Sequence, residues 1–135
     1  MYLLDTNVVS ELRKTKPHGG VLAWLRGVEE RDLHLSAVTL GEIQVGIELT
    51  REQDAAKAAD IEVWADRLAA TWNILPMDAA TFRLWAKFMR RRSNTLIEDA
   101  MIAATAQLHG FQVVTRNVAD FKEFGVRTFN PWTQR

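Results

Sequence analysis

The sequence predicts an α/β fold in which a central, mostly parallel sheet of about five short strands is flanked by helices on both faces, as a three-layer sandwich. Two observations carry this prediction. Short apolar runs alternate with longer stretches of helical periodicity, which is typical of a parallel sheet. Glycine and proline are few and scattered, so no linker divides the chain. With 135 residues, of which 47% are hydrophobic, we expect residues 1–135 to form a single domain.

Strands are predicted where a short apolar run stops at a polar residue, as in a fully buried strand. In chain order these runs are residues 2–4, 33–35, 73–76, 111–115 and 126–129. Helices are predicted where apolar residues recur every three or four positions. In chain order these stretches are residues 6–12, 21–28, 36–47, 54–72, 78–89, 96–108 and 118–124, the third opening at Ser36 or Thr39. Thr6, Asn7 and Asp78 can cap helices, and Gly110 can follow the end of one.

Composition excludes several classes of protein. Seventeen Lys and Arg residues balance seventeen Asp and Glu residues, so the net charge predicts no partner, although a local basic patch can still bind nucleic acid. Cysteine is absent, which excludes disulfides, thiolate nucleophiles and cysteine-bound metals. No apolar run approaches the roughly 20 residues of a membrane helix, and no basic segment precedes the first strand. We therefore expect no membrane association, no signal peptide and a cytoplasmic location.

Four acidic residues stand out by their positions. Asp5 and Asp120 follow predicted strands, and ligands collect at the carboxyl ends of parallel strands. Asp99 lies in an otherwise apolar helix, where a carboxylate is costly unless a hydrogen bond, an arginine or a cation compensates it. Glu42 lies in the first turns of its helix. A parallel sheet would bring these four segments to one edge.

Each of these acids also has a purely structural interpretation. Asp5, Asn117 and Asp120 can each act as a helix cap. Asp99 can interact favourably with the dipole of its helix, and Glu42 can form a capping box with Thr39. Taken together, however, clustered carboxylates repel one another unless a cation neutralises them. Oxygen ligands without cysteine or paired histidine favour Mg²⁺, with Mn²⁺ as an alternative, over zinc.

Five segments in this order resemble the PIN-domain ribonucleases, specifically the VapC-type toxins of bacterial toxin–antitoxin systems. The segments are residues 1–11, 35–43, 98–106, 114–121 and 130–132, and the resemblance covers essentially the whole chain. It implies a PIN-like fold and an Mg²⁺-dependent endoribonuclease that hydrolyses RNA phosphodiester bonds with metal-activated water. It also implies a homodimer and inhibition by a cognate antitoxin protein, with DNA contacted only through that antitoxin.

The resemblance further assigns roles to particular residues. It implies Asp5, Glu42, Asp99 and Asp120 as the catalytic carboxylates. Asp5 and Asp99 would be the principal Mg²⁺ ligands. Thr6 and Asn7 would order Asp5, and Thr115 and Asn117 would line the site. Some relatives carry an acid where this chain has Asn117, so we do not count it as a ligand.

An acidic site must meet a polyanionic substrate, so basic residues near the acids are candidate RNA contacts. Arg13 and Lys14 follow the first predicted strand and helix, and Arg116 neighbours Asp120. A second group of basic residues, between residues 83 and 92, recurs at helical spacing. That group is more simply interpreted as a solvated helix face.

Three other functions also involve acids that follow a strand or a PIN-like fold. A haloacid-dehalogenase-like phosphatase needs a second acid two residues after Asp5, where this chain has Asn7. A receiver domain needs paired acids early in the chain and a late lysine, and neither occurs in the expected place. A non-catalytic PIN-like module that binds RNA or protein is the remaining alternative. An Asp99→Asn variant would lose turnover if the chain is an enzyme and keep its binding affinity if it is a binding module.

Overall fold

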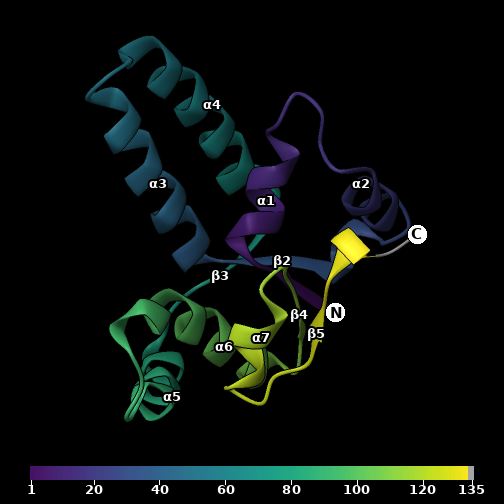
Figure 1. The fold of residues 1–135 in the computed structure, drawn as a ribbon, viewed down its shortest axis with the longest axis vertical. Helices are drawn as coiled ribbons and strands as arrows, with labels where there is room; N and C mark the ends of the chain where they lie inside the picture. The colour runs from purple at the N-terminus through teal and green to yellow at the C-terminus, as the bar shows by residue number, and fades with distance from the viewer. Residues whose placement is uncertain (134–135) are drawn as a thin grey trace.

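The computed structural model, which describes residues 1–133, confirms the predicted α/β sandwich with five parallel strands (Figure 1). The strands are β1 (Tyr2–Leu4), β2 (Leu33–Ser36), β3 (Asn73–Leu75), β4 (Gln112–Val114) and β5 (Thr128–Phe129). Their order is β3-β2-β1-β4-β5, and each neighbouring pair is parallel. The strand order reverses between β1 and β4. In open α/β sheets, ligands bind outside the carboxyl ends of the strands at such a switch point.

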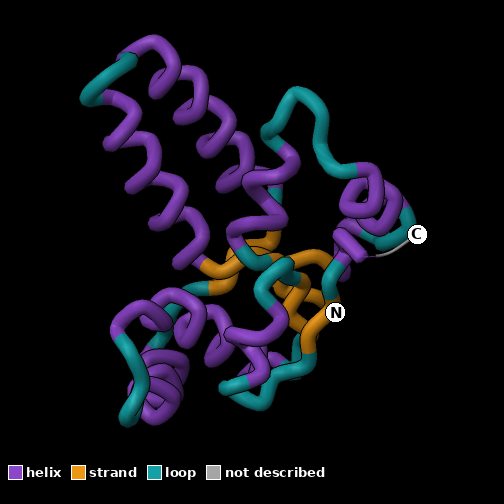
Figure 2. Tube along the Cα trace, in the orientation of Figure 1, coloured by secondary structure: helices purple, strands orange, loops and turns teal. Residues whose placement is uncertain are grey.

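Helices cover both faces of the sheet, as the tube in Figure 2 shows. One layer comprises α1 (Thr6–Leu12), α2 (Gly19–Arg26), α3 (Ala37–Arg51) and α4 (Ala55–Thr71). The other comprises α5 (Ala79–Met89), α6 (Ile97–His109) and α7 (Val118–Lys122). Single 3₁₀ turns lie at Glu30–Asp32, Asn94–Leu96 and Pro131–Thr133. Within the described residues, no helix combines the length and the apolar character that crossing a membrane requires.

The two layers have separate cores because side chains alternate between the faces of a strand. Leu3 of β1 and Val113 of β4 belong to the cluster under α6 and α7. Leu4 and Val114, their neighbours along the strands, belong to the cluster under α1 to α4. All four side chains are fully buried. The apolar runs at residues 2–4 and 112–114 are therefore unbroken because both faces of the sheet are covered.

Most predicted boundaries lie within two residues of the observed ones. Ser36, not Thr39, caps α3, because its hydroxyl accepts a hydrogen bond from the amide of Val38. The helix predicted at residues 21–28 begins two residues earlier, where the imidazole of His18 accepts a hydrogen bond from the amide of Gly20. Gly110 follows α6 with φ +70°, a left-handed conformation that glycine adopts without strain.

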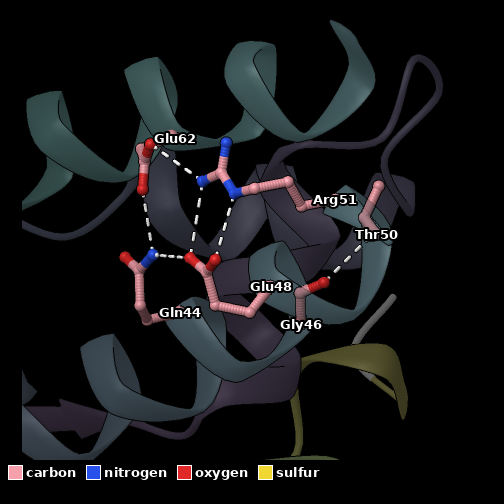
Figure 3. A network of polar contacts seen from close by, with 6 residues as sticks. All are labelled: Gln44, Gly46, Glu48, Thr50, Arg51 and Glu62. Atoms are coloured by element: carbon pink, nitrogen blue, oxygen red, sulfur yellow. Dashed lines mark hydrogen bonds and ion pairs between the residues drawn. The ribbon is translucent and has the colours of Figure 1, made fainter. Parts of the chain in front are cut away.

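Helices α3 and α4 form a hairpin that extends away from the sheet (Figure 1). Its outer surface carries a polar network (Figure 3). Arg51 donates hydrogen bonds to Glu48 on its own helix and to Glu62 of α4, and Gln44 donates to the same two carboxylates. Ile47, by contrast, is fully buried. Exposed ion pairs contribute little to stability, so the apolar contacts of the hairpin hold it together.

Candidate active site at the carboxyl ends of the strands

Asp5 directly follows β1 and is 4% exposed. Its Oδ1 accepts a hydrogen bond of 2.8 Å from the amide of Thr6 and so caps α1. Its Oδ2 accepts a hydrogen bond of 2.8 Å from the hydroxyl of Thr115. Burial raises the pKa of Asp5, the two hydrogen bonds partly offset this rise, and the charge of Asp120 adds to it. The helix-capping role predicted for Asp5 therefore accounts for Oδ1 only. Oδ2 is held by Thr115, which directly follows β4.

Thr115 connects the two turns that leave β1 and β4. Besides donating to Asp5, its hydroxyl oxygen accepts hydrogen bonds from the amide of Asn117 at 2.9 Å and from the side chain of Asn7 at 3.5 Å. The amide of Arg116 donates to Oδ1 of Asn7 at 3.5 Å. Asp5 thus lies within a hydrogen-bond network whose members come from opposite ends of the chain.

Glu42 lies on α3, where Oε1 accepts a hydrogen bond of 2.8 Å from the hydroxyl of Thr6. The Thr6 hydroxyl also lies 3.0 Å from that of Thr39, which is fully buried. Thr39 is therefore bonded to α1 and does not form the capping box considered from the sequence. Burial raises the pKa of Glu42, the hydrogen bond from Thr6 lowers it, and the charges of Asp5 and Glu98 raise it.

Asp99 lies in the first turn of α6, and within residues 1–133 its carboxylate forms no hydrogen bond. Burial raises its pKa most. The charges of Asp5, Asp120, Glu42 and Glu98 raise it further, to about 7. Three of these charges belong to the predicted acids, so the fold brings all four close enough to act on one another. Asp99 is the least compensated of them, because it is partly buried and no hydrogen bond offsets the rise in its pKa.

Asp120 lies in the first turn of α7 and is exposed. Asn117 occupies the N-cap position of that short helix, but its side chain forms no capping hydrogen bond. The charge of Asp120 raises the pKa of both Asp5 and Asp99, which places it beside them.

The four acids interact electrostatically, but they do not form a preformed metal-binding site. Within residues 1–133, no three carboxylate or imidazole side chains lie close enough together to hold one ion. Their chemistry nevertheless fits a hard divalent cation. Every donor is an oxygen, and a cation would relieve the mutual repulsion that raises the pKa of Asp99.

The basic residues predicted near the acids have different environments. Arg13 lines a groove of about 220 Å³ between α1, α3 and α4, which Thr6 and Glu42 also line. Lys14 is 62% exposed and forms an ion pair of 2.9 Å with Glu11. Arg116 is exposed, and its guanidinium stacks on the indole of Trp132 at 5.4 Å.

Sequence reasoning did not single out Glu11, which is 6% exposed. One of its oxygens accepts a hydrogen bond of 2.9 Å from the amide of His18, and the other pairs with Lys14. Lys14 and burial act in opposite directions on the pKa of Glu11, and the hydrogen bond from Lys14 dominates and lowers it. The sequence feature that could have identified Glu11 is an acidic residue among the apolar residues of α1. Glu11 fixes the loop that carries Arg13 and Lys14.

Comparison with known proteins places this geometry in a family. The sequence pattern of the PIN domain matches residues 2–126. The chain is 37% identical to VapC ribonuclease Y4jK of Sinorhizobium fredii, with 98% of each chain covered. It is 33% identical to toxin FitB of Neisseria gonorrhoeae, covering 98% of this chain and 99% of that protein. Among solved structures, FitAB bound to the IR36 DNA fragment contains a chain that superposes with a TM-score of 0.80 at 31% identity. That superposition covers 100% of this chain and 98% of the other.

Proposed function

This chain belongs to the PIN domain family, and on that basis we propose that it is a ribonuclease acting as the toxin of a toxin–antitoxin pair. Relatives matched over nearly their whole length are a VapC ribonuclease and a toxin. We further propose that its activity depends on a divalent cation, Mg²⁺ or Mn²⁺, and that Asp5, Glu42, Asp99 and Asp120 carry it.

One observation carries the chemical part of this proposal. Asp99 has a pKa of about 7 because burial and the charges of three other predicted acids oppose its ionisation. Such an arrangement is costly to a folded protein, and strongly perturbed carboxylates in one place are typical of functional sites. A bound divalent cation would supply an activated water and positive charge at the scissile phosphate. Asp5 and Asp99 are the residues we expect to hold it.

The remaining polar residues would order these carboxylates. Thr115 fixes Oδ2 of Asp5, and Thr6 fixes Oε1 of Glu42, so neither carboxylate has to be reoriented when substrate arrives. Asn7 and Asn117 hold Thr115 in place through its hydroxyl oxygen. Asp120 is exposed, which suits a carboxylate that meets the substrate or its water directly.

RNA must be held against the repulsion of these acids. Arg116 supports this role because it is exposed, adjoins Thr115 and has its guanidinium over the ring of Trp132. Arg13 lies on the groove beside Glu42. Lys14 contributes less by this reasoning, because Glu11 already pairs with it. We therefore propose Arg116 and Arg13 as the principal phosphate contacts and Lys14 as a minor one.

The proposed partner is a cognate antitoxin protein, with the toxin itself as a homodimer. The relation to FitB and to the FitAB–DNA structure supports an antitoxin that also links the pair to DNA. The groove between α1, α3 and α4 is lined by Ile43, Ile47, Ile61 and Trp64 on its apolar side and by Glu42 on its polar side. A peptide segment lying in this groove would cover Glu42 and block the site.

The proposal is tested with the purified chain, free of any antitoxin, incubated with total RNA and Mg²⁺. Parallel reactions contain Mn²⁺, EDTA or the Asp99→Asn variant. The matched control is Asp66→Asn, the same chemical change at an exposed position of α4. Discrete RNA fragments that disappear with EDTA and with Asp99→Asn, but persist with Asp66→Asn, would support a metal-dependent endoribonuclease.

The same experiment separates the enzyme from a non-catalytic binding module. If the folded chain produces no fragments with either metal, RNA affinity is measured instead. Retained RNA binding by both the unsubstituted chain and Asp99→Asn, without cleavage by either, would reject the enzyme in favour of the binding module.

A further inference from the structure

The connection between α5 and α6 borders a hollow of about 600 Å³. Its lining consists of Arg90, Arg91, Arg92, Ser93, Leu96 and Glu123. The side chains of Arg90 and Arg91 are exposed, and within residues 1–133 neither forms an ion pair or a side-chain hydrogen bond. The site described above uses neither residue. Arg90 and Arg91 thus place two uncompensated guanidinium groups on a concave surface.

Arg92, the third arginine, is occupied by internal contacts. It donates hydrogen bonds to the carbonyl oxygens of Phe88 and Glu123, and its guanidinium lies 4.9 Å from the ring centroid of Phe124. Its Nε is also 3.8 Å from the carboxylate of Glu123. The one acid in the lining is therefore paired with Arg92, and it does not neutralise Arg90 or Arg91.

The backbone that carries these arginines is fixed at both ends. The amide of Arg92 donates to the carbonyl of Met89 at 3.0 Å, and Trp85 of α5 donates through Nε1 to the carbonyl of Ile97 at 3.2 Å. Arg91 has φ +62°, a left-handed conformation that a residue with a side chain adopts only at a cost. The turn therefore carries both arginines on a backbone that is held by contacts on either side of them.

The hollow adjoins the acidic site along the chain. Leu96 forms part of its wall, and Asp99 follows three residues later, about 5 Å further along the helix axis. Side chains on a helix tilt toward its N-terminus, which is the end of α6 that faces the hollow. The wall of the hollow at Leu96 and the carboxylate-bearing residue Asp99 therefore lie within one helical turn of each other.

We propose that the hollow at Arg90 and Arg91 is a subsite for the phosphodiester backbone of single-stranded RNA next to the cleaved bond. This inference rests on the proposed ribonuclease function and adds a location for the strand that leaves the site. Guanidinium groups suit this task, because their paired N–H donors match the oxygens of a phosphate. Contacts to the backbone would hold the strand without reading its sequence.

The test measures the affinity of RNA and its dependence on salt. All variants carry Asp99→Asn, so that RNA stays intact in the presence of Mg²⁺, and a labelled single-stranded RNA of mixed sequence is titrated at several KCl concentrations. The test variant is Arg90→Gln with Arg91→Asn, because asparagine tolerates the left-handed conformation. The control is Lys57→Gln with Arg67→Gln, two exposed cations on α4 in the opposite helical layer. Thermal unfolding confirms that each variant is folded.

Loss of two phosphate contacts is expected to reduce the slope of the logarithm of the association constant against the logarithm of the salt concentration by about 1.4. This assumes about 0.7 per phosphate contact for a single strand. This corresponds to about 25-fold weaker binding near 0.1 M salt. The control should keep the parental slope and affinity. An unchanged slope in the test variant, or an equal loss in the control, overturns the subsite while leaving cleavage by the unsubstituted chain intact. Absence of RNA binding by the Asp99→Asn parent would also overturn the subsite, whereas the ribonuclease function is judged separately by cleavage with the unsubstituted chain.

Discussion

The hydroxyl of Thr115 donates a 2.8 Å hydrogen bond to Oδ2 of Asp5 across 110 positions of the chain. Both residues are buried, so the carboxylate has no water to replace this donor. The bond stabilises the charged form of Asp5 against the burial that opposes it. It also fixes the direction in which the free lone pairs of Asp5 face the site.

Thr115→Val should therefore lower RNA cleavage by roughly 10- to 100-fold, as loss of a residue that orders a metal ligand does. The Mg²⁺ concentration at half-maximal activity should rise. The control is Thr105→Val, which removes another fully buried hydroxyl. Its partners are the carbonyl of Met101 and the sulfur of Met77, neither of which belongs to the candidate site. Equal activity of the two variants across a Mg²⁺ titration would show that Thr115 does not order Asp5 for catalysis.

The metal-free chain should lose stability as pH rises. Asp99 keeps its proton up to about pH 7 in the folded chain, against about 3.8 for an ordinary carboxyl. Its raised pKa thus favours the folded state fully below about pH 4, and this advantage is lost as pH rises through 7. Asp99→Asn should remove part of the loss. If ~1 kcal/mol survives solvent screening, the variant melts about 3–5 °C higher than the parent at pH 8 in EDTA.

Asp66→Asn provides the comparison for this experiment, because Asp66 is exposed on α4. It should reproduce the parental dependence of melting temperature on pH. A parental chain whose melting temperature stays flat between pH 5 and pH 8 would contradict the uncompensated charge at Asp99.

Divalent cations should stabilise the chain without any substrate. At pH 8, a concentration of Mg²⁺ or Mn²⁺ about 100 times its Kd is expected to add about 2.7 kcal/mol to the free energy of unfolding. EDTA should reverse the effect. Asp5→Asn and Asp99→Asn should each abolish most of it, since each removes one proposed ligand. A rise in melting temperature of the same size in both variants would show that the cation binds elsewhere.

Glu11 and Lys14 form one ion pair but should contribute differently to the free energy of unfolding. Glu11→Ala leaves the amide of His18 without its partner in a partly buried place and is expected to cost about 1–3 kcal/mol in the free energy of unfolding. Lys14→Ala removes only the exposed member of the pair and should cost less than about 1 kcal/mol. Urea unfolding of both variants measures the difference, and equal costs would indicate that the ion pair, not the buried acceptor, matters.

The hairpin of α3 and α4 offers a similar contrast. Ile47→Ala is expected to cost about 2–5 kcal/mol, because it opens a cavity in the core. Arg51→Met should change the free energy of unfolding little and should reduce its dependence on salt, since the contacts of Arg51 in Figure 3 are exposed to water. A larger loss from Arg51→Met than from Ile47→Ala would mean that the polar network holds the hairpin together.

Local patterns along the sequence were sufficient to predict the five strands and the layers of helices. The runs at residues 2–4 and 112–114 are apolar because both faces of the sheet are covered, and this signal needs no distant information. Asp5 and Asp120 could be singled out because they follow strands. Whether these acids perform catalysis stays a prediction.

Other features depend on contacts between distant segments, and local patterns did not identify the partners. The sequence offered Thr39 as a capping partner of Glu42, whereas tertiary packing places it against Thr6. Glu11 is an acid among apolar residues of its helix, but the sequence does not show that the following loop brings the amide of His18 to it. The basic residues near the end of α5 were interpreted as one solvated face, but Arg92 is bound to Glu123 and Phe124, on a segment 31 residues away.

The strand order of the sheet also determines at what point during synthesis the site can first assemble. β1 is the central strand, yet its neighbour β4 and the hydroxyl that holds Asp5 are made about 110 residues later. At about 5–20 residues per second, the ribosome needs roughly 5 to 20 seconds to add the residues between Asp5 and Thr115. Asp99 joins the nascent chain only late in that interval, and Asp120 follows Thr115. The assembled site can therefore exist only once residues up to Asp120 have been synthesised, and a chain terminated before that point lacks one.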